Sequence, residues 1–128
     1  MTPADELWAA AEKLRALATA ASTGPRDEPT SRWHFKRRDA RSGYLYAANP
    51  HGPGMRLIHG DANGGNRHPG MHPRHGEYAA AMGPAVGLAV ANWLDGAAAL
   101  IAELPGAEYL PRTHNALAVA RAILKEQP

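Results

Sequence analysis

The spacing of hydrophobic positions changes twice along the chain and divides it into three segments. From Leu7 onward, apolar residues recur at every third or fourth position, which is typical of one face of an amphipathic helix. Thr2 is a residue type favoured as an N-cap, Pro3 suits the first helical position, and Gly24 is a common stop. The first segment is therefore predicted to form a helix over residues 3–21.

The second segment alternates between apolar and polar positions, which is the pattern of half-buried strands. It predicts an antiparallel meander with strands at about 32–38, 43–49 and 55–60. The apolar face of this sheet is expected to carry Trp33, Phe35, Leu45, Ala47, Met55 and Leu57. The opposite, basic and aromatic face is expected to carry His34, Lys36, Arg38, Tyr44, Tyr46, Arg56 and Ile58. Because isolated hairpins are marginal in water, the apolar face is predicted to pack on helices.

The third segment returns to helical spacing after a loop over residues 60–76. The pattern predicts a short helix at about 77–82, a longer one at about 84–104 opened by Pro84, and a last helix at about 113–126 capped by Thr113. The buried stripe of the long helix is expected to contain Val86, Ala89, Val90, Trp93, Leu94, Ala97, Leu100, Ile101 and Leu104.

Taken together, these elements predict a single α+β domain over residues 1–128. It has an N-terminal helix, a small three-stranded antiparallel sheet, and two to three C-terminal helices packed on that sheet. The chain has no cysteine, which excludes disulfides, thiolate metal ligands and a cysteine nucleophile. Its longest apolar run, "AAAMGPAVGLAVANWL", contains Gly and Pro and is shorter than a bilayer span. We therefore expect a soluble cytoplasmic protein.

The net charge of +2 conceals an uneven distribution of charged residues. Residues 26–74 hold nine Lys or Arg against four Asp or Glu, a balance of +5, so the two flanks together carry −3. A basic middle between flanks that together carry a negative net charge indicates that this segment meets an anionic partner. A solvated basic loop region explains the same pattern equally well.

The stretch "NRHPGMHPRHGE", residues 66–77, concentrates histidines, arginines, prolines and glycines. His68, His72 and His75 could supply three of the nitrogen ligands that zinc prefers, with Glu77 as a base. Nothing rigid orients these side chains, because prolines and Gly70 separate them and no helical H-E-x-x-H pair is present. Polar loop histidines are the favoured interpretation, and no metal ligand is assigned.

Anion binding is a second interpretation of the same region. Flexible glycine-rich backbone precedes a helix start, where N–H groups favour anions, and Arg67 and Arg74 add forked donors suited to phosphate. Tyr44 and Tyr46 could stack a base on the sheet, although they could equally well cover sheet surface. The predicted ligand-binding residues are Lys36, Arg38, Tyr44, Tyr46, Arg56, Arg67 and Arg74.

Two stretches carry a resemblance to a known family. "AASTGPR" after the first helix and "GEYAAAMGPAVGLAVANWLDGAAAL" after the strands resemble the Ead-like early proteins of bacteriophages and actinobacterial prophages, over residues 7 to about 104. Arg26 stands where the family usually has tryptophan, and His75-Gly76 stand where it has Asp-Ala. The resemblance implies a small accessory protein of phage origin in the host bacterial cytoplasm, and it supplies no common catalytic residues.

No catalytic set stands out in the chain: it shows no nucleophile elbow, no triad-like order and no paired carboxylates. We therefore expect a non-enzymatic protein, without a cofactor, that binds a phosphate-bearing small molecule or nucleotide signal, with counter-defence as its purpose. Small residues on the long helix predict a homo-oligomer. Two alternatives are an inhibitor that binds a host protein through an apolar helical face, and a histidine-ligated metal-dependent hydrolase.

Overall fold

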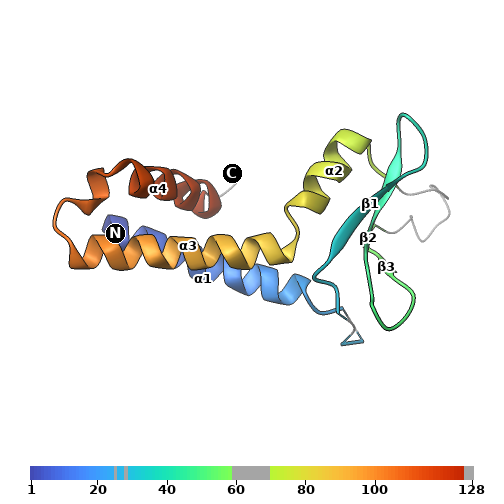
Figure 1. Ribbon diagram of the computed structural model, residues 1–128, viewed down its shortest axis with the longest axis horizontal. Helices are drawn as coiled ribbons and strands as arrows, with labels where there is room; N and C mark the ends of the chain where they lie inside the picture. Colours follow the sequence, from blue (N-terminus) through green and yellow to red (C-terminus); the bar gives the residue numbers. More distant parts are fainter. Residues whose placement is uncertain (25, 28, 59–69, 126–128) are drawn as a thin grey trace. The chain divides into compact units, whose positions relative to one another are not determined.

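The computed structural model describes residues 1–24, 26–27, 29–58 and 70–125 (Figure 1). The elements follow in the order α1 (Pro3–Ala21), β1 (Trp33–Arg37), β2 (Gly43–Ala47), β3 (Met55–Arg56), α2 (Pro73–Ala81), α3 (Pro84–Glu103), the 3-10 helix η1 (Ala107–Tyr109) and α4 (Pro111–Leu124). This confirms the predicted α+β class, with an N-terminal helix, a three-stranded antiparallel sheet and C-terminal helices.

The chain gathers into two compact units, although the sequence analysis expected one domain. We call residues 1–18 with 87–128 the helical unit, and residues 19–86 the sheet unit. The core of the helical unit is built from α1, α3 and α4 and is rich in alanine. Its buried members are Leu7, Ala10, Ala11, Ala91, Leu94, Ala97, Ala98, Ala116, Leu117 and Ala120.

The first helix begins as predicted, through a reciprocal pair of hydrogen bonds. The Asp5 backbone N–H donates to the Thr2 hydroxyl oxygen at 3.1 Å, and the Thr2 N–H donates to the Asp5 carboxylate at 3.1 Å. The bond from the Thr2 backbone N–H is the main reason that the pKa of the Asp5 carboxyl is lowered from its ordinary value, because the charged carboxylate is the better acceptor. The predicted bounds of 3–21 are confirmed.

The end of α1 depends on a residue that sequence analysis did not single out. Thr30 is buried, and its hydroxyl donates to the Ala21 carbonyl while its N–H donates to the Ser22 carbonyl at 2.9 Å. Carbonyls in the last turn of a helix lack partners within the helix, so Thr30 satisfies one of them and returns the chain toward β1.

The sheet has strand order β1-β2-β3, and its register confirms the predicted alternation. Trp33 pairs with Ala47, Phe35 with Leu45, and Ala47 with Met55, so the apolar side chains share one face. The strands are shorter than predicted, and β3 has only two residues.

The loop that joins β1 to β2 is closed by Asp39. The Asp39 carboxylate accepts N–H bonds from Arg41 at 2.7 Å and from Ser42 at 2.9 Å. The bond from Arg41 is the main reason that the pKa of Asp39 is lowered from its ordinary value.

Helix α2 begins at Pro73, four residues before the predicted start at 77, so the predicted loop over 60–76 was wrong at its end. His72 is the N-cap, and its Nδ1 accepts the Arg74 N–H at 3.1 Å. The helix packs on the apolar face of the sheet at Gly76, where an added Cβ would come within 2.2 Å of the Phe35 ring. A histidine cap followed by proline is a start signal that the usual Ser, Thr, Asp or Asn rule does not contain.

The predicted role of Thr113 was also wrong. Helix α4 begins at Pro111 with Leu110 as the N-cap residue, so Thr113 lies inside the first turn. Its buried hydroxyl donates to the Leu110 carbonyl at 2.9 Å and also to the Ala107 carbonyl. Thr113 therefore ties α4 to η1 as a donor and does not accept helix N–H groups.

The predicted buried stripe of α3 was partly wrong. Leu94 is fully buried, whereas Trp93 is 43% exposed and Leu104 48% exposed. Helical spacing places these residues on neighbouring faces, and a helix that is apolar on most sides gives no signal for which face turns inward. The unit instead buries the small residues Ala91 and Ala98 beside Leu94.

Among the described residues, α3 is a helix long and apolar enough, by length and composition alone, to cross a membrane. It is longer than the run considered from the sequence, because the helix begins at Pro84 and continues past Leu94 to Glu103. A mostly buried core helix of a soluble protein passes the same test, and 22% of the apolar window of α3 is buried. Within the helical unit, α3 carries Asp95 midway, and Arg15 of α1 pairs with that carboxylate at 2.6 Å.

Candidate anion-binding face

The polar side of the sheet brings together residues from all three strands. His34 pairs with Tyr46 and Lys36 with Tyr44 across β1 and β2, and Tyr46 pairs with Arg56 across β2 and β3. Directly opposed residues in an antiparallel pair point to the same face. We call these five residues the basic–aromatic face.

The aromatic rings on this face form a continuous row in which the Tyr46 ring lies next to those of both His34 and Tyr44. The His34 and Tyr46 rings stack with centroids 5.5 Å apart and planes 30° apart, and the Tyr44 ring lies 5.9 Å from that of Tyr46. The guanidinium carbon of Arg56 lies 4.6 Å from the centroid of the Tyr44 ring. Such a cation–π contact contributes about 0.5–1 kcal/mol at an exposed site, so it restrains Arg56 above the ring.

A pocket of about 380 Å³ opens on the face and is lined by Lys36, Tyr44, Tyr46, Gly54 and Arg56. Two cations and no acidic side chain form this lining, and the volume lies within the range of small-molecule sites. A Cβ at Gly54 would stand 2.9 Å from the Ala47 carbonyl oxygen and 3.2 Å from the Tyr46 ring. Glycine therefore allows the chain before β3 to lie close against the ring.

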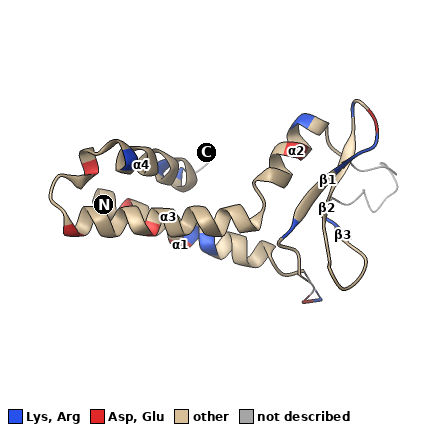
Figure 2. Cartoon of the chain, viewed as in Figure 1, with Lys and Arg blue, Asp and Glu red and all other residues tan. Residues whose placement is uncertain are grey.

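The charge distribution agrees with this placement. Figure 2 shows Lys and Arg on β1, on the loop after it and on β3, with an acidic residue in the same loop. That acidic residue is Asp39, whose carboxylate is engaged by the backbone of its own turn. The basic–aromatic face itself contains no carboxylate among the residues that line its pocket.

Four of the seven predicted ligand-binding residues meet in the pocket: Lys36, Tyr44, Tyr46 and Arg56. Arg38 follows the end of β1, and one of its terminal nitrogens lies beside Gly70, 3.6 Å from where a Cβ of Gly70 would be. It does not line the pocket.

The last two predicted residues do not join the pocket as described. Arg74 lies on α2, which packs on the apolar face of the sheet and not on the basic–aromatic one. Arg67 lies outside the described residues. Gly54 is the lining residue that sequence analysis missed, and its signal was the "GPGM" turn before β3.

The histidine-rich stretch is used structurally where it is described. His72 caps α2, and its ring centroid lies 6.2 Å from that of His75. Glu77 pairs with Arg37 at 3.1 Å, and His68 falls outside the described residues. In the described part of the chain, no three His, Asp or Glu side chains are grouped so as to hold a metal ion.

Comparison of the chain with protein-family models, with curated proteins and with solved structures found no match.

Proposed function

We propose that the protein is a non-enzymatic binding protein whose basic–aromatic face holds a phosphate-bearing small molecule or nucleotide. One observation carries the proposal: Lys36 and Arg56 flank the paired rings of Tyr44 and Tyr46 in a pocket without acidic residues. A base can stack on a tyrosine ring, while ammonium and guanidinium groups pair with phosphate.

The contact between Arg56 and Tyr44 supports phosphate recognition. Stacking over the ring uses the flat surface of the guanidinium, and its N–H donors lie in the plane of the group. These donors stay free for a forked pair of hydrogen bonds to phosphate oxygens. Lys36, opposite Tyr44 in the sheet, adds a second cation on the same face.

The biological setting follows from the family resemblance, as a proposal. By that resemblance we propose a small accessory protein of phage origin that acts in the host bacterial cytoplasm and binds a nucleotide signal there. Sequestering such a signal would serve counter-defence without chemistry, which fits a binding face without a catalytic set.

Calorimetric titration tests the proposal. The panel contains inorganic phosphate, nucleoside mono-, di- and triphosphates, cyclic dinucleotides and short single-stranded oligonucleotides. We expect the parent protein to bind at least one nucleotide and the double variant K36Q/R56Q to lose about tenfold or more in affinity, because hydrogen bonds to charged groups are strong. The matched control is R37Q, which removes a cation of the same strand that pairs with Glu77.

Both variants should keep the melting temperature of the parent, since exposed ion pairs contribute little. A mononucleotide in the pocket should lose little affinity as salt rises, whereas an oligonucleotide contacted at several phosphates should lose affinity steeply. The proposal fails if the parent binds no member of the panel, or if R37Q weakens binding as much as the double variant does.

A further inference from the structure

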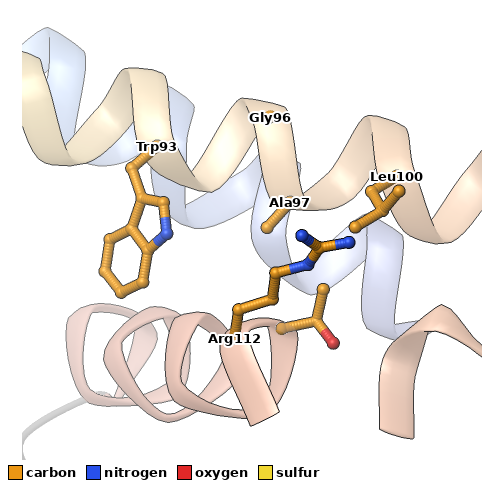
Figure 3. A pocket seen from close by; sticks show the side chains of 6 residues that line it. Trp93, Gly96, Ala97, Leu100 and Arg112 are labelled. Carbon is orange, nitrogen blue, oxygen red and sulfur yellow. The ribbon is translucent and has the colours of Figure 1, made fainter. Parts of the chain in front are cut away.

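The helical unit contains a second recess, between α3 and α4. A groove of about 410 Å³ is lined by Trp93, Gly96, Ala97, Leu100, Arg112 and Thr113, and we call it the Trp93 groove. Figure 3 shows the Trp93 and Leu100 side chains extending from α3 toward α4, and Arg112 extending from α4 toward α3. Apart from Arg112 and Thr113, no side chain in this lining is polar beyond the indole N–H.

Gly96 has no explanation within the fold. Glycine is a poor helix former, so a glycine inside a helix usually indicates that another part of the chain packs too closely for a side chain. Gly87 has such a neighbour, because a Cβ there would lie 3.2 Å from the Cβ of Ala18. At Gly96 an added Cβ would meet nothing within 4 Å among the described residues. The space above Gly96 is open at the wall of the groove.

An apolar row, exposed except at the half-buried Leu100, runs along α3 through Gly96. Ala89, Trp93, Gly96 and Leu100 are spaced by three or four residues, and Leu104 follows directly after the helix. Trp93 and Leu104 are nearly half exposed, although both are large and apolar. From Ala89 to Leu100 the row spans 11 residue steps, or about 16 Å of helix, which is long enough to contact the i, i+4 and i+7 side chains of one partner helix.

Arg112 indicates the chemistry of the occupant. Within the described part of the chain, no hydrogen bond or ion pair engages its side chain, whereas Arg121 on the same helix pairs with Glu6 at 2.9 Å. A guanidinium in an apolar wall favours a carboxylate, which it can bind through two parallel N–H bonds.

We propose that the Trp93 groove binds an amphipathic helix of a partner protein. Apolar side chains at positions i, i+4 and i+7 of that helix lie along the row on α3. Its backbone approaches closest at Gly96, and a Glu or Asp on its flank pairs with Arg112. This is a protein-docking surface distinct from the basic–aromatic face, and it does not depend on the function proposed for that face.

Charge decides against a second copy of the chain as the occupant of this groove. A symmetric pair would place the same lining against itself, and that lining contains Arg112 but no carboxylate. A helix with a carboxylate on its flank supplies the missing charge, and a copy of this lining does not.

The test uses the full chain and a displayed library of 18-residue helices. Each library member has leucine fixed at i, i+4, i+7 and i+11, and Glu, Gln or Lys varied at the flanking positions. Sorting on the parent protein should enrich Glu at one flank, and sorting on R112Q should abolish that enrichment. The matched control R121Q removes another cation of α4 and should leave the enrichment unchanged.

The variant G96A separates docking from folding. Alanine is the better helix former and meets open space, so the melting temperature should rise by about 3–5 °C. Binding of the best enriched peptide, measured by fluorescence anisotropy, should nevertheless weaken about tenfold, because the new methyl group occupies the point of closest approach.

Four outcomes would overturn the proposal. They are a library without enrichment, an enrichment that R112Q retains, unchanged peptide affinity in G96A, and binding of phosphatidylglycerol vesicles that R112Q or G96A weakens. The last outcome would assign the same apolar row to a lipid surface.

Discussion

The two compact units expose their aromatic residues in opposite ways. On the sheet, Tyr44 and Tyr46 rest against each other, against His34 and under Arg56, so each ring is held by neighbours of the same face. In the helical unit, Trp93 lines a mainly apolar groove. Gly96 lines the same groove, and a Cβ at Gly96 would meet no described atom within 4 Å. Preorganised polar groups suit a small charged ligand, whereas an open apolar row suits a partner surface that completes it.

The largest expected effect separates buried from exposed residues on α3. L94A should lower the free energy of unfolding by about 2–5 kcal/mol, because Leu94 is fully buried and its removal leaves a cavity. W93A should cost about 1 kcal/mol, since much of the indole already faces solvent. Urea denaturation of both variants measures the difference. Equal losses in L94A and W93A would place Trp93 in the core. The helical unit would then lack the exposed aromatic side chain that distinguishes it from the sheet unit.

A second prediction concerns the glycine that lets α2 lie on the sheet. G76A should destabilise the sheet unit by about 1–3 kcal/mol, because the new methyl group would overlap the Phe35 ring and α2 must shift. Circular dichroism melting of G76A beside G96A checks this, since one alanine meets an aromatic ring and the other meets open space. A stabilised G76A would mean that α2 does not contact Phe35.

A third comparison uses the buried threonine in each unit. Thr30 donates to the last turn of α1, and Thr113 donates to carbonyls just before α4. T30V and T113V keep the shape and remove the donor, so each should cost about 1–2 kcal/mol. Thermal melting of T30V and T113V measures these losses. A variant as stable as the parent would contradict the hydrogen bond assigned to that threonine hydroxyl.

The smallest expected effect is a dependence of the unfolding free energy on pH in the acid range. The pKa values of Asp5, in the helical unit, and Asp39, in the sheet unit, are both lowered because these carboxylates accept backbone N–H bonds. Their contribution to stability is therefore full above the ordinary Asp pKa of 3.8, which applies to the unfolded chain, and it is lost as pH falls through the lower pKa values of the folded protein. Unfolding of D5N and D39N followed from pH 5 to pH 2 should show a flatter pH dependence than the parent. A slope equal to that of the parent in both variants would contradict the assignment.

Sequence alternation predicted the sheet well, for a physical reason. A period of two residues assigns every strand position to one face, so the shared face of Lys36, Tyr44, Tyr46 and Arg56 followed from the pattern, whereas the register that pairs Tyr46 with His34 and Arg56 did not. Gly54 did not follow, because its role depends on how closely the chain before β3 approaches the Tyr46 ring.

The helices were harder to predict. The period of α3 gives the rows of side chains but not the rotation of the helix about its axis, so Trp93 was assigned to the core and Leu94 shared its stripe. Arg74 was assigned to the anion site as a forked donor in the loop before a helix expected to begin at 77. Helix α2 instead begins at Pro73 with His72 as its N-cap, so Arg74 lies on this helix.

The alanine-rich core of the helical unit has a genetic consequence. Seven of its ten buried members are alanines. Single-nucleotide changes in an alanine codon give Val, Thr, Ser, Pro, Gly, Asp or Glu, and most of these are larger, charged or helix-breaking. A close-packed core resists such gains in volume and buried polarity. Few single-nucleotide substitutions at these alanine codons therefore preserve the core. Substitutions in the apolar row on α3, where side chains meet solvent, leave the core intact, so this part of the helix can change to fit new partners.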